Sequence, residues 1–166
     1  MGKEFCIAPL AETDIAAVIE LAGVIWRHHY PGIIGMEQIE YMLAQRYTPA
    51  VIRAQMQSGK AWWDEAVLDG RIIGFAQYEP YEHSMKLDKL YLHQDFQRRG
   101  YGGIMLAHVE AQARSRGCGE VRLNVNKYNV KSIAAYRKNR YEVAEAVVVD
   151  IGRGYSMDDY VMEKKL

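Results

Sequence analysis

The sequence runs Lys89-Leu90-Tyr91-Leu92-His93-Gln94-Asp95-Phe96-Gln97-Arg98-Arg99-Gly100-Tyr101-Gly102 where an apolar, strand-like segment gives way to a polar loop and then to a helical pattern. Backbone N–H groups in the first turn of a helix have no partner within the helix and carry partial positive charge, so they bind phosphate. Gly100 and Gly102 lack a Cβ and let a ligand approach the backbone. Arg98 and Arg99 add full positive charge. The stretch therefore predicts an anion-binding loop between a strand and a helix.

Other interpretations of this loop differ in how well they fit its spacing. An ordinary surface loop, with glycines for turn geometry and arginines for solubility, remains open from the loop alone. A dinucleotide-binding Rossmann loop fits poorly, because Gly100 and Gly102 are not followed by a third glycine three positions on. A Walker loop is excluded, because no Gly-Lys-Ser or Gly-Lys-Thr follows.

Outward from the loop, the apolar patterns and turn residues predict the remaining elements. Strands are expected at 5–8, 62–68, 71–78, 85–92, 120–125, 141–150 and 158–164. Helices are expected at 15–26, from 37, from Thr48-Pro49 to near 59, at 104–116 and at 130–138, with a loop at 80–83. This order predicts an α/β (α+β) fold, with a mixed, mostly antiparallel central sheet of about seven strands and helices on both faces.

Length and composition narrow the class of protein. A chain of 166 residues fits a single domain, 1–166. Lys and Arg total 21, as do Asp and Glu, and a net charge of zero argues against a nucleic-acid-binding surface. No apolar run is long enough for a membrane span, and charges and Pro9 interrupt the N-terminus, so we expect a cytoplasmic protein.

No metal site is expected. Cys6 and Cys118 are far apart, have no metal-ligand spacing and are interpreted as reduced, partly buried residues. His28 and His29 are adjacent, so on a helix they face different ways and make a poor metal pair.

The quoted stretch resembles the signature of the GNAT superfamily of N-acetyltransferases, Gln/Arg-x-x-Gly-x-Gly/Ala after a strand of the Leu-Tyr-Val kind. Downstream, Leu123-Asn124-Val125-Asn126 followed by Asn129, Ser132, Ile133 and Tyr136 resembles the family's second element, a strand, an Asn and a helix bearing a Tyr. The ending Asp159-Tyr160-Val161-Met162-Glu163-Lys164 is also similar. The resemblance covers the chain from about Arg71 onward, and its visible departure is Arg140-Tyr141 where the family often has Gly-Phe or Gly-Tyr.

The resemblance implies a GNAT fold in which acetyl-CoA lies between two splayed parallel strands, here 85–92 and 120–125. Family members bind the pantetheine arm on the first strand and the pyrophosphate on the loop. Carried onto this sequence, the cofactor-binding residues are Leu90, Tyr91, Leu92, Gln97, Arg98, Arg99, Gly100, Tyr101, Gly102, Gly103 and Asn129. Asn129 fits equally well as a residue that caps a helix.

The implied function is direct transfer of the acetyl group of acetyl-CoA to a primary amine of a small molecule or polypeptide. Tyr136 matches the family position of the acid that protonates the leaving thiolate, although it also fits as a packing residue. Many relatives carry a Glu as the base where this chain has Lys86, which leaves Asp88, Glu79, His83 or water as the base. The alternative is a non-catalytic sensor that binds acetyl-CoA.

The acceptor is not identified by the sequence. The segment 26–47 is rich in aromatic and polar residues and is expected to form the wall on the acceptor side. Its composition suits a small amine or a peptide N-terminus and selects neither. Assembly into a homodimer is also left open.

Overall fold

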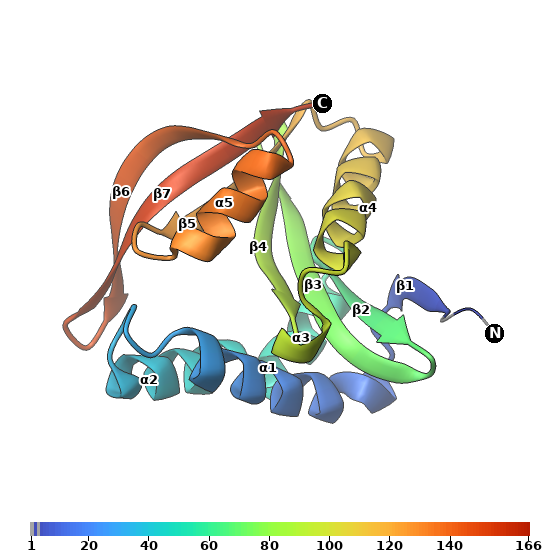
Figure 1. Ribbon diagram of the computed structural model, residues 1–166, viewed down its shortest axis with the longest axis horizontal. Coiled ribbons are helices and arrows are strands. Elements are labelled where there is room, and N and C mark those ends of the chain that lie inside the picture. Colours follow the sequence, from blue (N-terminus) through green and yellow to red (C-terminus); the bar gives the residue numbers. More distant parts are fainter. Residues whose placement is uncertain (1, 3) are drawn as a thin grey trace.

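The computed structural model describes residues 2 and 4–166, and its seven strands form one mixed sheet in the order β1-β2-β3-β4-β5-β7-β6 (Figure 1). The strands are β1 (Phe5–Pro9), β2 (Trp62–Leu68), β3 (Arg71–Tyr81), β4 (Ser84–Leu92), β5 (Glu120–Asn126), β6 (Glu142–Gly152) and β7 (Tyr155–Lys165). The helices are α1 (Ile15–His29), α2 (Met36–Arg46), α3 (Pro49–Gln57), α4 (Tyr101–Ser115) and α5 (Val130–Lys138). Neighbouring strands are antiparallel except β4 and β5, which are parallel. The predicted fold class is confirmed.

Helices cover both faces of the sheet. α1, α2 and α3 pack on one face, where Trp63 and Phe75 are buried among them. α4 and α5 pack on the other face, against Tyr78 and Leu123. Figure 1 shows α1 and α2 along the bottom of the view, with α4 and α5 above them. Because side chains alternate along a strand, β2 gives Trp63 to the first core and Trp62 to the second.

The loop predicted at 80–83 is too long, because only Glu82 and His83 form the turn. β3 continues to Tyr81 and β4 begins at Ser84, and these two residues lie opposite each other in the hairpin. Pro80 is tolerated there because β2 pairs with β3 only as far as Tyr78, so the end of β3 has one neighbour and behaves as an edge strand. The hairpin therefore carries β4 to its position with a shorter turn than the sequence indicates.

The helix ends differ from the predicted ones in two places. α4 begins at Tyr101, three residues before the predicted start, so the glycines that follow lie inside its first turn. α1 continues beyond the predicted end at 26 to His29, which brings that histidine to the site described below. Arg140, where the resemblance leads us to expect glycine, has a φ of 71°, so it adopts the left-handed conformation after α5.

A β-bulge in β4 opens the centre of the sheet. Gln77 of β3 lies opposite Lys89 and Tyr78 lies opposite Leu87, so Asp88 is the extra residue on β4. The parallel pairing of β4 with β5 covers only 84–87 and 120–123, and it ends at the bulge. Beyond this point β4 follows β3 while β5 follows β7, and the two strands diverge (Figure 1).

Candidate active site

A cavity of about 330 Å³ lies where β4 and β5 separate. It is lined by both strands, by α5 and β7, and by residues of α1 and α2. Seven residues singled out from the sequence line it: Asp88, Leu90, Tyr91, Leu92, Gln97, Asn129 and Tyr136. The segment expected to form the acceptor wall contributes Trp26, His29, Tyr30, Met42, Gln45 and Arg46.

The loop at 98–103 forms the N-terminus of α4, beside the cavity rather than in its lining. Gly100 is the N-cap residue, with a φ of 87°, and no side chain caps this helix end. A Cβ on Gly100 would meet no atom within 4 Å, so the backbone conformation rather than crowding within the protein calls for glycine here. The first N–H groups of α4 are therefore available to an anion.

Three side chains at or next to this loop make contacts within the protein. Tyr101 stacks on Phe5 with ring centroids 4.5 Å apart. The guanidinium of Arg99 lies 5.6 Å from the centre of the Phe96 ring. Gln97 donates a hydrogen bond from Nε2 to the carbonyl oxygen of Leu92, at 3.0 Å. The loop thus offers mainly backbone groups to a ligand, and Gln97 ties it to the end of β4.

Tyr136 lines the cavity from α5. Its ring packs at 62° against that of Tyr141, with centroids 5.8 Å apart. Burial, with a smaller contribution from Tyr30, raises the pKa of Tyr136 well above its ordinary value. Within the described residues its hydroxyl makes no hydrogen bond. Tyr136 therefore carries a proton at neutral pH, as the predicted acid requires.

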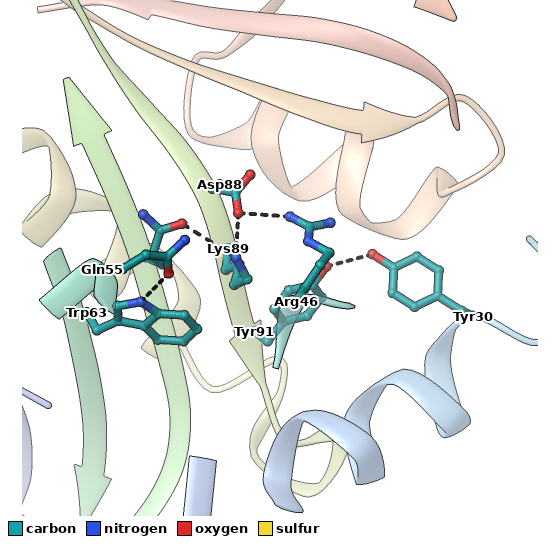
Figure 2. Close-up of polar contacts among 8 residues, drawn as sticks. Tyr30, Arg46, Gln55, Trp63, Asp88, Lys89 and Tyr91 are labelled. Carbon is teal, nitrogen blue, oxygen red and sulfur yellow. Dashed lines mark hydrogen bonds and ion pairs between the residues drawn. The ribbon is translucent and has the colours of Figure 1, made fainter. Parts of the chain in front are cut away.

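Asp88 lies between two cations (Figure 2). Its Oδ2 accepts from Nη2 of Arg46 at 2.8 Å and from Nζ of Lys89 at 2.5 Å. Burial alone would raise the pKa of Asp88, but the charges of Arg46 and Lys89 outweigh burial and hold the pKa well below its usual range. A carboxylate in this state is a poor proton acceptor. The electrostatics therefore disfavour the predicted role of Asp88 as a general base.

The other candidate bases do not line the cavity. Glu79 lies opposite Lys86 in the hairpin, and His83 lies in the turn between β3 and β4. Lys86, where the resemblance leads us to expect a Glu, does line the cavity. Of the bases named from the sequence, Asp88 has a lowered pKa and Glu79 and His83 lie outside the cavity lining, which leaves water.

Asn129 joins α1 to α5 beside the cavity. It is the N-cap of α5, and its Oδ1 accepts from the N–H of Ser132 at 3.4 Å. The same oxygen lies 3.0 Å from Nε2 of His29, so Nε2 is the nitrogen that donates. Burial lowers the pKa of His29, with the hydrogen bond to Asn129 opposing it. His29 is thus a neutral, oriented side chain rather than a metal ligand.

Two residues expected at the site, Tyr30 and Tyr91, contact each other, and a further one, Asp159, gave only a weak signal in the sequence. The hydroxyls of Tyr30 and Tyr91 lie 2.8 Å apart at the cavity wall (Figure 2). Asp159 of β7 lines the cavity with 5% of its surface exposed, and its Oδ1 has no hydrogen-bond partner in the described part of the chain. The one signal for Asp159 in the sequence is its place in the closing motif Asp159-Tyr160-Val161-Met162-Glu163-Lys164, on a strand that is buried at 159, 161 and 162.

Within residues 2 and 4–166, no group of three or more His, Cys, Asp or Glu side chains is placed to hold a metal ion. No helix formed by these residues is long and apolar enough to cross a membrane. Both cysteines are free, and Cys6 is exposed rather than partly buried, while Cys118 is buried.

Comparison with known proteins shows which family and fold the chain resembles. Residues 25–140 match the Acetyltransferase (GNAT) family. The chain is similar to a spermidine N(1)-acetyltransferase from Thermoplasma acidophilum, with 26% identity over 163 residues and 96% of each chain covered. Its structure resembles that of the PaiA N-acetyltransferase from Thermoplasma acidophilum in complex with coenzyme A, with a TM-score of 0.85, 26% identity, and 98% and 99% of the two chains covered. A GCN5-related N-acetyltransferase from Rhodopseudomonas palustris shares the fold, with a TM-score of 0.82, 21% identity, and 100% and 99% of the two chains covered.

Proposed function

The chain belongs to the acetyltransferase (GNAT) family, and from this premise we propose that its acceptor is a primary amine on a flexible aliphatic chain, of the polyamine class. The chain is an acetyl-CoA-dependent N-acetyltransferase that acts on amines. The observation that carries the finer proposal is the acceptor side of the cavity, where aromatic walls meet Asp159, a carboxylate with an unpaired oxygen. The similarity to a spermidine N(1)-acetyltransferase over most of both chains supports this choice.

The residues present fit acetyl-CoA. The N–H groups at the start of α4 suit the pyrophosphate, since this helix end has no side-chain cap. Between 89 and 92, the edge of β4 that faces β5 has no strand partner, because the parallel pairing ends at Leu87. An extended pantetheine arm can pair with such an edge as an added strand does. When bound, acetyl-CoA supplies the acetyl group as an activated thioester.

Tyr136 is assigned the role of the acid. Its raised pKa keeps the proton on the hydroxyl at neutral pH, and a departing thiolate in the same cavity needs a proton. Successive N–H groups of a strand alternate between its two edges, and after Leu87 those on the edge of β4 toward β5 have no strand partner. Such a group suits the carbonyl oxygen of the acetyl group as negative charge develops on it.

The aromatic side chains of Trp26 and Tyr30 form the acceptor wall, and both are buried. Aromatic faces attract ammonium groups and also pack well against methylene chains. A cavity of about 330 Å³ suits a slender chain better than a folded protein surface. A peptide N-terminus remains the second acceptor class, since the same wall accommodates a single extended backbone.

The test is an acceptor screen. The purified protein is incubated with acetyl-CoA and either spermidine, a simple alkyl monoamine or a short peptide with a free N-terminus, and thiol release is measured. The proposal expects spermidine to give the highest kcat/KM. A preference for the peptide would overturn the acceptor class and keep the enzyme. Binding of acetyl-CoA without thiol release from any amine would favour the sensor. Sedimentation of the same preparation tests whether the protein forms a homodimer.

A further inference from the structure

Two carboxylates lie among the described residues that line the cavity, Asp88 and Asp159, and they differ in their surroundings. Asp88 is bound by Arg46 and Lys89. Asp159 is 95% buried, and its Oδ1 has no hydrogen-bond partner in the described part of the chain. A buried carboxylate oxygen without a partner costs free energy, so its presence calls for a ligand that supplies a donor.

The position of Asp159 follows from the register of the sheet. On β7 it lies opposite Asn126 at the end of β5, where β5 has already separated from β4. Met157, two residues earlier on β7, packs with the core under α1 and α2 and also lines the cavity, which places Asp159 on the side of the sheet that these helices cover. This is the acceptor side, across the cavity from α5.

The groups around Asp159 come from several elements. Burial raises its pKa, and the side chain of Asn124 on β5 lowers it by hydrogen bonding. Asp158 of β7 raises the pKa further, while Arg46 of α2 and Lys127 after β5 lower it. Burial, with a smaller contribution from Asp159, raises the pKa of Tyr30, the residue after α1, and Tyr30 in turn contributes to the raised pKa of Tyr136. Burial dominates, so Asp159 holds a proton more readily than an exposed aspartate does.

We propose that Asp159 is the catalytic base of this enzyme, the carboxylate that takes the proton from the ammonium group of the acceptor. The inference rests on the proposed function only in needing an amine acceptor. An alkylamine has a pKa of about 10.4, so at neutral pH it enters the cavity as an ammonium ion. The ammonium ion forms an ion pair with the buried carboxylate, and this pair is poorly solvated. Proton transfer converts it to a neutral pair, whose desolvation costs less free energy.

The proposed step balances as follows. The ammonium N–H bond breaks, its proton passes to an oxygen of Asp159, and the nitrogen keeps the electron pair. That pair forms the bond to the acetyl carbon, and the carbon–sulfur bond breaks with its electrons staying on sulfur. Tyr136 then donates its proton to the sulfur. The nitrogen gives up its second proton, and this proton finally returns to Tyr136. Asp159 releases its proton to solvent between turnovers.

The experiment compares Asp159→Asn with Asp158→Asn at saturating acetyl-CoA, with the best amine from the acceptor screen. Asp158 is the matched control, because it is the next residue on β7 but pairs with Lys127 at 2.6 Å and does not line the cavity. Asp159→Asn is expected to lower kcat by about 10²-fold or more, the usual effect of one acid–base group, while Asp158→Asn stays near wild type. Asp159→Glu, which keeps a carboxylate, should recover part of the loss.

The pH profile separates a base from a binding or structural residue. In the wild type, kcat/KM should fall as the pH drops through the raised pKa of Asp159, because the protonated carboxyl accepts no proton. The deficit of Asp159→Asn should shrink as the pH approaches about 10.4, where the amine is already neutral in solution. A variant with normal kcat and raised KM for the amine would overturn the proposal and make Asp159 an ammonium-binding residue.

The proposal is also overturned if Asp159→Asn keeps wild-type kcat, or if its deficit is the same at every pH. Thermal melting and acetyl-CoA binding confirm that the variants are folded. If Asp159→Asn does not fold, the pH profile of kcat/KM is measured on the wild type with a monoamine and with a polyamine. If kcat/KM does not fall at low pH with either amine, Asp159 is not the catalytic base. Failure of the wild type with every amine would instead contradict the proposed function.

Discussion

At the scale of single residues, Tyr136 provides the sharpest test of the assigned acid. Tyr136 lines the cavity, and burial raises the pKa of its hydroxyl, so the protonated form persists through neutral pH. Tyr136→Phe removes one oxygen and leaves the packing against Tyr141 nearly intact. We expect turnover to fall by about 10²-fold or more, with acetyl-CoA affinity unchanged.

The measurement is the initial rate of thiol release at saturating acetyl-CoA, with acetyl-CoA binding followed by calorimetry. A decrease in turnover of less than about threefold would leave Tyr136 as a packing residue and assign proton donation to water.

Asp88 is expected to act on stability rather than as a base. Asp88→Asn leaves Lys89, which is 3% exposed, without its carboxylate partner, and should lower the free energy of unfolding by about 3 kcal/mol, the low end for breaking a buried ion pair. The stabilisation is present above the usual aspartate pKa of about 3.9 and is lost as the pH falls toward the lowered pKa in the fold. Denaturant unfolding at neutral and acidic pH measures it. Equal stability of variant and wild type at neutral pH would contradict this account.

At the scale of elements, the N-terminus of α4 is predicted to bind the pyrophosphate through its backbone. Gly100→Val forces a β-branched residue to adopt a φ of 87° and puts a side chain over the N–H groups. We expect acetyl-CoA affinity to fall by at least about tenfold, or 1.4 kcal/mol. Gly117→Val is the control, because Gly117 follows the other end of α4, has a φ of 75° and also has open space around it.

Both variants should lose similar stability, and Gly100→Val alone should lose affinity in a calorimetric titration with acetyl-CoA. Equal affinity of the two variants would place the pyrophosphate elsewhere.

The N-caps of α3 and α5 form a second matched pair. Thr48 accepts from the N–H of Val51 at 3.1 Å, and Asn129 caps α5 in the same way. Replacing either by Ala should cost about 1 kcal/mol of stability. Asn129→Ala should in addition slow turnover, because it frees His29 and loosens the helix that carries Tyr136. Melting curves measure the stability, and thiol release measures the turnover. If the two variants lose the same stability and Asn129→Ala keeps wild-type turnover, Asn129 acts only as a helix cap.

At the scale of the whole molecule, Glu65 of β2 should make stability depend on pH. Burial, together with hydrogen bonding to Asp14 and the charge of Asp14, raises the pKa of Glu65 from 4.5 to about 7, against a backbone hydrogen bond at Ala11. Between these values the folded state binds more protons than the unfolded state, so the free energy of unfolding falls as the pH rises through this window. Glu65→Gln removes that slope.

Denaturant midpoints across this pH range, for the wild type and Glu65→Gln, measure the effect, with the exposed Glu37→Gln of α2 as the control. A wild-type slope that persists in Glu65→Gln would show that other groups cause it.

The elements and their order were predictable from the sequence, because they depend on neighbouring residues. β2 lies at the predicted 62–68, and α5 lies at the predicted 130–138. The helix begins at Thr48-Pro49 as predicted, since Thr48 caps it and Pro49 occupies its first turn. Apolar periodicity, capping residues and glycines carry this information locally, and the same signals led to the loop before α4.

The state of the site was decided by tertiary structure. The charge balance at Asp88 depends on Arg46, which lies 42 positions away and reaches it only because α2 packs beside β4 at the bulge. The burial of Asp159 depends on the point where β5 leaves β4, and the orientation of His29 depends on Asn129, 100 positions further along the chain. The sequence by itself determined which side chains with reactive groups the chain contains and which elements carry them. Their protonation was determined by burial and by neighbouring charges, which come together only when segments distant in sequence pack against one another.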